Sequence, residues 1–159
     1  MRMLDASSII HAWDEYPPEQ FPGLWTWMAR EISSGRLTIC EVAFDEVGHK
    51  VSECAQWLEE AGIEKLRIDG KALAEAARIK NLLGIVGDNY HTGGVDENDL
   101  LIMAVAKERG ACLVSNEAVQ TSLPGNRARF KIPAVCALPS VSVECVNFSK
   151  YFKQSRKIF

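Results

Sequence analysis

The sequence lacks any run of about 18 apolar residues, the length that a membrane-spanning helix requires. It also lacks an apolar leader, because Asp5 interrupts the opening MRMLDASSII where a signal peptide needs its apolar segment. We therefore expect a cytoplasmic protein that is neither exported nor inserted in a membrane.

Several motifs that carry known chemistry are missing as well. The five cysteines, at positions 40, 54, 112, 136 and 145, are widely spaced and include no C-x-x-C pair, which argues against a disulfide scaffold or a zinc finger. The three histidines share no ligand spacing with one another or with the cysteines. The glycine-rich segment 84–95 lacks the G-x-x-x-x-G-K-[ST] pattern of a phosphate-binding loop. No Ser-His-Asp or Cys-His motif is present.

What is present is the composition of an ordinary globular protein. Apolar residues make up 47% and charged residues 25% of the 159 residues, which predicts one domain over 1–159 with a sizeable core. The charge is uneven, since residues 1–126 carry 11 Lys and Arg against 20 Asp and Glu, whereas residues 127–159 carry 7 against 1. A basic tail of this kind can bind a polyanion, but charge alone favours a solvated terminal helix.

Glycine and proline divide the chain into alternating short strands and helices. The segment 41–61, for example, has an apolar stripe at helical spacing, formed by Val47, Val51, Cys54 and Leu58. Strands are expected at 3–4, 37–40, 111–114, 132–138 and 141–146, and helices at 6–13, 19–34, 41–61, 70–83 and 97–109, followed by a basic helical tail. This alternation predicts an α/β fold with a central, mainly parallel sheet, in which chemistry takes place outside the carboxyl ends of the strands.

Acids stand at those predicted strand ends. Asp5 follows the first strand, Glu117 comes shortly after strand 111–114, and Glu46 lies in the helix after strand 37–40. Asp99 is in the first turn of a helix that is apolar all round and therefore buried. Four carboxylates in one cleft repel each other unless cations bind between them, and a cluster of oxygen ligands suits Mg²⁺ or Mn²⁺.

Each acid also has a structural interpretation. Asp96 and Asp99 are three residues apart at a helix start, where an N-cap and an N3 acid need no further role. Glu41 and Glu46 flank the same apolar stripe, so periodicity does not choose between them. Glu117 fits a first-turn acid beside a helix dipole, and Asp5 an ordinary residue before a helix.

Four segments resemble, in order, the motifs of the PIN-domain superfamily, and together they span nearly the whole chain. They are L-D-A-S-S-I-I at 4–10, E-V-A-F-D-E-V at 41–47, D-E-N-D-L-L-I-M-A-V-A at 96–106 and L-V-S-N-E at 113–117. The ending K-I-P-A-V-C at 131–136 resembles an uncharacterised subfamily of that superfamily. The resemblance implies a three-layer α/β/α PIN-like fold, and it selects Glu46 over Glu41 and Asp99 as the third acid.

The resemblance also implies a function, that of the VapC-like toxin ribonucleases of toxin–antitoxin pairs. Asp5, Glu46 and Asp99 would bind Mg²⁺ or Mn²⁺, with Glu117 completing the site directly or through water. Cleavage of an RNA substrate would leave 5′-phosphate and 3′-hydroxyl ends. An antitoxin protein and a second copy of the chain, forming a homodimer, are the implied partners.

Other residues are assigned supporting roles. Ser7 and Ser115 are expected to hold a carboxylate or a water molecule by hydrogen bonding, as groups outside a metal's own ligands do. Arg127, Arg129 and Lys131 are candidates for contacts with the RNA backbone.

The chain departs from the family pattern at the fourth acid. The usual residue there is Asp, and Glu117 is one methylene longer. Asp96 offers a competing carboxylate one turn from Asp99. Two alternative functions remain open at this point: a PIN-like domain that binds RNA or protein without cleaving, and a metal-dependent nuclease that acts on DNA.

Overall fold

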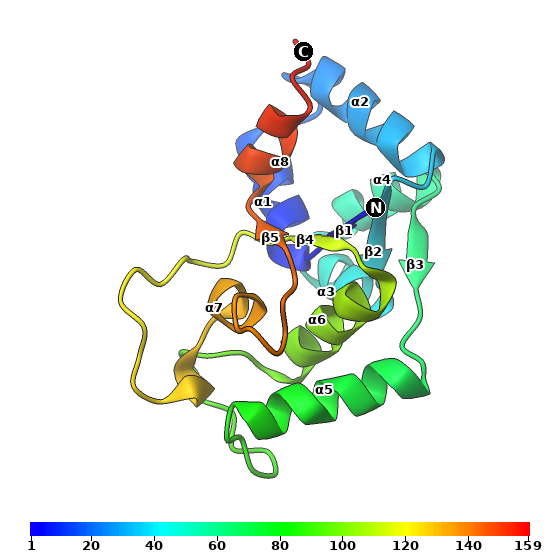
Figure 1. Ribbon diagram of the computed structural model, residues 1–159. Helices are drawn as coiled ribbons and strands as arrows, with labels where there is room; N and C mark the ends of the chain where they lie inside the picture. Colours follow the sequence, from blue (N-terminus) through cyan, green and yellow to red (C-terminus); the bar gives the residue numbers. More distant parts are fainter.

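The computed structural model, which describes residues 1–159, is built around a five-stranded parallel sheet (Figure 1). The strands are β1 (Arg2–Leu4), β2 (Leu37–Cys40), β3 (Glu64–Leu66), β4 (Cys112–Val114) and β5 (Cys145–Val146). Their order across the sheet is β3-β2-β1-β4-β5, so β1 is central and pairs with β2 on one side and β4 on the other. Every strand points the same way, and all five carboxyl ends meet at one edge.

Helices cover both faces of the sheet and give a three-layer α/β/α arrangement (Figure 1). They are α1 (Ala6–Glu15), α2 (Pro22–Ser33), α3 (Glu41–Lys50), α4 (Ser52–Glu60), α5 (Gly70–Leu82), α6 (Glu97–Arg109), α7 (Ile132–Cys136) and α8 (Phe148–Gln154), with a 3₁₀ turn η1 (Arg127–Arg129). Helix α1 packs on α3 and α4, whereas α6 packs on α5 and α7. Helices α3 and α6 also contact each other, although α3 belongs to the connection from β2 to β3 and α6 to the connection from β3 to β4.

The core is one continuous cluster of 44 buried apolar residues. Helix α6 runs through it, as its apolar sequence predicts, with Leu100 and all of residues 102–106 buried. Gly110 ends α6 in the left-handed region at φ +58°, a conformation that residues with a Cβ adopt only at a cost. No helix is long and apolar enough to cross a bilayer.

The strand predicted at 132–138 is wrong, since this segment forms helix α7. Pro133 lies in the first turn, where its fixed φ favours a helix and its missing N–H is not needed. The buried residues Ile132, Val135 and Cys136 follow helical spacing. In so short an apolar run, this spacing cannot be told from the pattern of a buried strand. In the strand predicted at 141–146, only Cys145–Val146 pairs with a neighbour.

The single helix predicted at 41–61 is two helices, separated at Val51, whose φ of −144° and ψ of 80° are not helical. The break lets both α3 and α4 pack on α1. Strand β3 was not expected from the sequence, because it is a short edge strand whose first two residues, Glu64 and Lys65, are exposed. It carries neither an apolar run nor a clear alternation.

Candidate functional site

Asp5 lies at the carboxyl end of the central strand β1 and precedes α1. Its backbone N–H donates to the carbonyl oxygen of Val114 at 2.9 Å, so the edge of the sheet continues one residue beyond the strand. The residue is only 3% exposed, which is unusual for an aspartate without a cationic partner. Although Asp5 occupies the N-cap position of α1, its side chain makes no capping hydrogen bond. The carboxylate is thus not explained by helix capping.

Two serine hydroxyls hold the Asp5 carboxylate. Ser7 Oγ donates to Asp5 Oδ2 at 2.5 Å, and Ser115 Oγ donates to the same oxygen at 2.9 Å. Ser7 lies in the first turn of α1 and Ser115 directly follows β4, so the fold brings them together from 108 positions apart. Ser7 Oγ also accepts the backbone N–H of Asn116 at 2.9 Å. These bonds fix one carboxylate oxygen, whereas Oδ1 receives no side-chain hydrogen bond.

The surroundings of Asp5 oppose its charge. Burial raises the pKa of the Asp5 carboxyl above its usual value, the hydrogen bonds from Ser7 and Ser115 act in the opposite direction, and the negative charge of Glu46 raises the pKa further. Glu46 therefore lies within electrostatic range of Asp5.

Asp99 forms a capping box with Asp96 at the start of α6. Asp96 Oδ1 accepts the Asp99 backbone N–H at 2.9 Å, and Asp99 Oδ2 accepts the Asp96 backbone N–H at 2.9 Å. Asp96 and Asp99 thus do serve as N-cap and N3 residue of α6, but helix capping does not account for the raised pKa of Asp99. Burial raises the pKa of Asp99 to about 7, and the charges of Asp96, Asp5 and Glu117 act in the same direction, whereas the hydrogen bond from Asp96 opposes them.

Asp96 and Asp99 differ in their exposure. Asp96 is exposed at the helix end, while Asp99 is half-buried and lies within range of the Asp5 charge. Of the two acids, Asp99 is therefore the more deeply buried, at the start of the helix that runs through the core.

Glu46 and Glu41, which periodicity leaves equivalent, have different surroundings. Glu41 Oε1 accepts the backbone N–H of Ile68 at 3.0 Å and so anchors the chain after β3. Glu46 instead pairs with Lys50 one turn later in α3, with 2.5 Å between Nζ and Oε1. The negative charges of Asp5 and Asp96 also raise the pKa of Lys50, though less than its hydrogen bond to Glu46 does.

Glu117 lies in the loop after β4. No helix begins there, so the helix-dipole interpretation of this acid is wrong. Its backbone N–H donates to Ser115 Oγ at 3.3 Å, and its carboxylate is 3.9 Å from Lys131 Nζ. Lys131 is thus placed beside Glu117, and the exposed Arg127 and Arg129 lie a few residues before it on the turn η1.

Gly94 holds η1 against the entrance to α6. A Cβ at this position would lie 2.0 Å from the carbonyl oxygen of Ala128 and 3.0 Å from the Cα of Arg129. The next residue, Val95, donates its N–H to the Phe130 carbonyl at 3.1 Å. The basic turn therefore packs on the segment that leads directly to Asp96 and Asp99. Sequence reasoning missed both Gly94 and Lys50, although the Glu46–Lys50 pair has the i,i+4 spacing typical of helix ion pairs.

The four acids come from four separate segments, and their charges are coupled through Asp5 and Asp99. As the side chains stand, no three His, Cys, Asp or Glu residues are arranged to hold a metal ion. Two of the acids, Glu46 and Glu117, lie beside lysines. The donors nevertheless fit a hard cation in kind, because they are all carboxylate oxygens and the innermost is oriented by two hydroxyls.

The three layers and the strand order of the parallel sheet are those of a PIN-like fold. Among solved structures, a chain in the crystal structure of VapBC2 from Rickettsia felis bound to a DNA fragment from their promoter is similar, with a TM-score of 0.55 and 19% identity over 92% of this chain and 97% of that chain. The protein belongs to the family described as a domain of unknown function, DUF4411, whose family model matches residues 3–159. None of the curated proteins matches the sequence.

Proposed function

We propose that this protein is a Mg²⁺- or Mn²⁺-dependent endoribonuclease that hydrolyses RNA phosphodiester bonds. One observation carries the proposal: the buried Asp5, oriented by Ser7 and Ser115, lies within range of the half-buried Asp99, whose pKa is raised to about 7. Keeping two carboxylates close together in a buried place costs free energy, because their negative charges repel each other away from water. Such arrangements are typical of functional sites, and a bound divalent cation would remove the repulsion.

Asp5, Glu46 and Asp99 are the residues proposed to hold the ion, and Glu117 completes the set. Asp5 Oδ1 and Asp99 Oδ1 carry no hydrogen bond from a side chain or from the capping box. Glu46 and Glu117 would exchange their contacts with Lys50 and Lys131 for contacts with the ion. A bound Mg²⁺ or Mn²⁺ supplies a water of lowered pKa and neutralises charge on the phosphate.

The remaining residues position the substrate and the ligands. Ser7 and Ser115 keep Asp5 in one orientation and so fix where the ion sits relative to the sheet. Lys131, Arg127 and Arg129 form a basic flank beside the acids, and we assign to it the RNA backbone on either side of the cleaved bond.

The proposal extends to the biological setting of the enzyme. The similarity in fold to a chain of the VapBC2 structure supports the proposal that this protein is a toxin, which an antitoxin protein would hold inactive. We further propose a homodimer, for which light scattering should give twice the 17.6 kDa of one chain.

The function is tested by incubating the purified protein with mixed RNA and Mn²⁺ and sequencing the ends of the fragments. We expect cuts that carry 5′-phosphates, and we expect them to disappear in Asp5→Asn, which keeps the shape of the side chain and removes its charge. Asp88→Asn is the matched control, because Asp88 is exposed and its side chain makes no hydrogen bond.

The outcome separates the candidate functions. Equal cleavage by the wild type and by the Asp5→Asn and Asp99→Asn variants contradicts the assigned site. RNA binding without cleavage, together with no Mn²⁺ binding in calorimetry, identifies a binding domain instead. Cleavage of DNA but not RNA identifies a DNA nuclease.

A further inference from the structure

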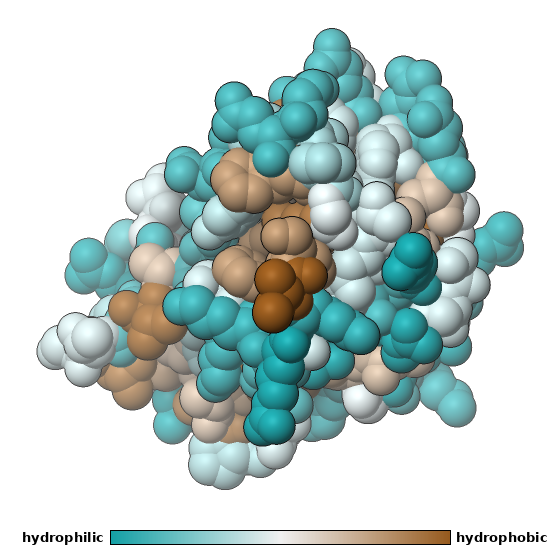
Figure 2. Space-filling view, turned by 90° about the horizontal axis from the view of Figure 1, so that it is seen from above, coloured by the Kyte–Doolittle hydropathy of each residue, from teal (hydrophilic) through white to brown (hydrophobic).

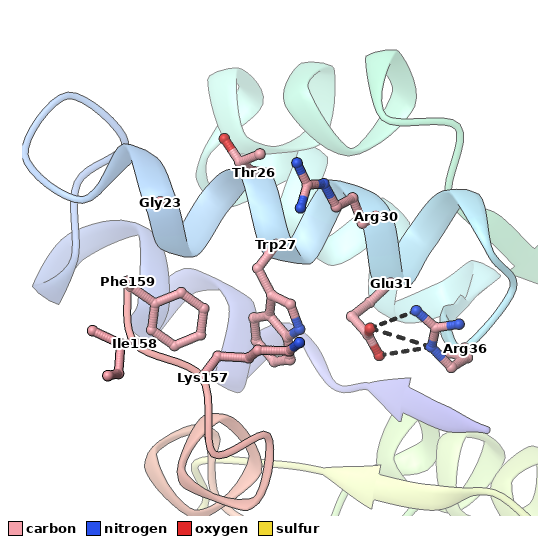
Figure 3. Close-up of a pocket in the computed structure, with 9 residues that line it drawn as sticks. All are labelled: Gly23, Thr26, Trp27, Arg30, Glu31, Arg36, Lys157, Ile158 and Phe159. Carbon is pink, nitrogen blue, oxygen red and sulfur yellow. Dashed lines mark hydrogen bonds and ion pairs between the residues drawn. The ribbon is translucent and has the colours of Figure 1, made fainter.

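A second candidate site lies at the opposite edge of the sheet from the acids. A cavity of about 450 Å³ opens between α2 and the residues after α8, and a smaller one of about 140 Å³ adjoins it. The two share Trp27, Glu31 and Lys157 as lining residues. We call them together the α2–α8 cavity (Figure 3). Arg2, the first residue of β1, lines the smaller part, whereas Asp5 follows the other end of the same strand.

The smaller part of the cavity contains two buried polar groups without a protein partner. The Tyr151 side chain is 2% exposed, and its hydroxyl makes no hydrogen bond. The Nε of Arg2 is likewise buried without an acceptor, although another nitrogen of the same guanidinium donates to Gln154 Oε1 at 3.2 Å. Unpaired buried donors are rare in folded proteins, because each gives up its hydrogen bonds to water. Both residues line the smaller part of the cavity, where a ligand that brings acceptor oxygens would give these donors a partner.

The charge of the cavity favours an anion. Arg2, Arg30 and Lys157 line it without an acidic partner, and Arg36 lies at its rim. The one acid, Glu31, is already neutralised, since Arg36 donates to it from Nε and from NH2, the latter at 2.7 Å. Figure 3 shows this ion pair at one end of the cavity. Donors and positive charge therefore surround the same space.

The larger part of the cavity has aromatic walls. The Trp27 ring lies 5.1 Å from that of Tyr151 and 5.3 Å from that of Phe159 between centroids. Figure 3 shows Trp27 and Phe159 side by side, and Figure 2 shows apolar side chains gathered in the middle of this face with hydrophilic ones around them. Gly23 lets the chain end approach α2, because a Cβ there would lie 3.2 Å from the carbonyl carbon of Phe159. Aromatic faces of this kind accept a planar ring.

We propose that the α2–α8 cavity binds a nucleoside monophosphate, with its phosphate at Arg2 and Tyr151 and its base against Trp27 and Phe159. The sizes agree with this orientation, because the smaller part suits a phosphate and the larger part a base with its sugar. The site does not depend on the acids at the other edge, so it stands whether or not the protein cleaves RNA.

The proposal is tested by titrating the full chain with AMP, GMP, CMP and UMP while following tryptophan fluorescence, and by calorimetry in parallel. We expect saturable binding of at least one nucleotide, and binding of inorganic phosphate alone to be at least tenfold weaker. A 5′-phosphorylated oligonucleotide is the second arm. Binding of the oligonucleotide alone overturns the proposal in favour of a nucleic-acid surface, and binding of neither overturns it altogether.

Tyr151→Phe is the diagnostic variant, because it removes only the unpaired hydroxyl. We expect about tenfold weaker nucleotide binding with unchanged or higher thermal stability in the absence of ligand. Tyr90→Phe is the matched control, since Tyr90 lines neither part of the cavity. A Tyr151→Phe variant that binds as tightly as the wild type overturns the assignment of the phosphate position.

Discussion

Replacing Asp99 with Asn should make the metal-free protein more stable at neutral pH. The change removes the charge of the half-buried carboxylate and keeps its size. The helix cap survives, because the Asn amide oxygen accepts the Asp96 backbone N–H as Asp99 Oδ2 does at 2.9 Å. The substitution therefore isolates the cost of a negative charge among the other acids.

The magnitude follows from the pKa of Asp99, which burial and neighbouring acids raise from 3.8 to about 7. Each unit corresponds to about 1.4 kcal/mol, so ionised Asp99 destabilises the fold at pH 7 by up to about 4 kcal/mol. Local rearrangement and entry of water reduce this figure, and we expect a gain of about 1–3 kcal/mol in the variant. For a chain of this length, each kcal/mol raises Tm by about 2–4 °C.

Thermal unfolding in EDTA across a pH series measures the effect. The folded pKa of Asp99 lies above the unfolded one, so the penalty is absent below about pH 4 and grows as the pH rises toward 7. The difference in Tm between variant and wild type should grow over the same range. With Mn²⁺ added, the wild type should have the higher Tm, because the ion stabilises the wild type and binds the variant poorly.

Two results would refute this reasoning. One is an Asp99→Asn variant that is less stable than the wild type in EDTA at pH 7. The other is a gain that is the same at pH 4 and pH 7, which would mean that the charge is not its source. Asp88→Asn, an exposed charge removal, should change Tm little at any pH.

Three further predictions follow from the site and its supports. Gly94→Ala should destabilise the protein by more than about 2 kcal/mol in urea unfolding, because its Cβ would lie 2.0 Å from the Ala128 oxygen; Gly125→Ala, with open space around it, should cost far less. Ser115→Ala removes one hydrogen bond to the buried carboxylate and should weaken Mn²⁺ binding about 10-fold or more in calorimetry; unchanged affinity would remove Ser115 from the site. Arg129→Ala should lower the slope of log K against log salt for RNA binding by about 1, and an unchanged slope would exclude a phosphate contact.

The sequence predicts the parts of the fold in which local pattern and tertiary position agree. Helix α6 spans Glu97–Arg109, the range expected from its apolar run and the glycine that ends it. Strand β2 likewise occupies Leu37–Cys40. Its four consecutive buried residues are typical of an interior strand of a parallel sheet, which is covered on both faces. The all-parallel sheet follows from the alternation of strands and helices.

The errors arise where packing overrides local pattern. The apolar stripe of 41–61 continues across Val51, yet the chain bends there so that both halves reach α1. Segment 132–138 is apolar enough for a strand, and only Pro133 signals the helix. At the candidate site, the sequence predicts Asp5 directly after the first strand and Asp99 in the first turn of a buried helix, as the structure has them, but it does not reveal that Lys50 and Lys131 pair with Glu46 and Glu117.

The central position of β1 has a consequence for the order of folding. Strand β1 is the first element of the chain, yet one of its two partners, β4, begins at Cys112, and the hydroxyl of Ser115 that holds Asp5 comes 110 residues later. Such non-local pairing folds slowly and cannot begin before both segments exist. At about 5–20 residues per second, a ribosome needs roughly 5–20 s to make the stretch between them. A nascent chain therefore carries all the apolar surface of β1 but no organised acidic site until the residues through Ser115 have been made.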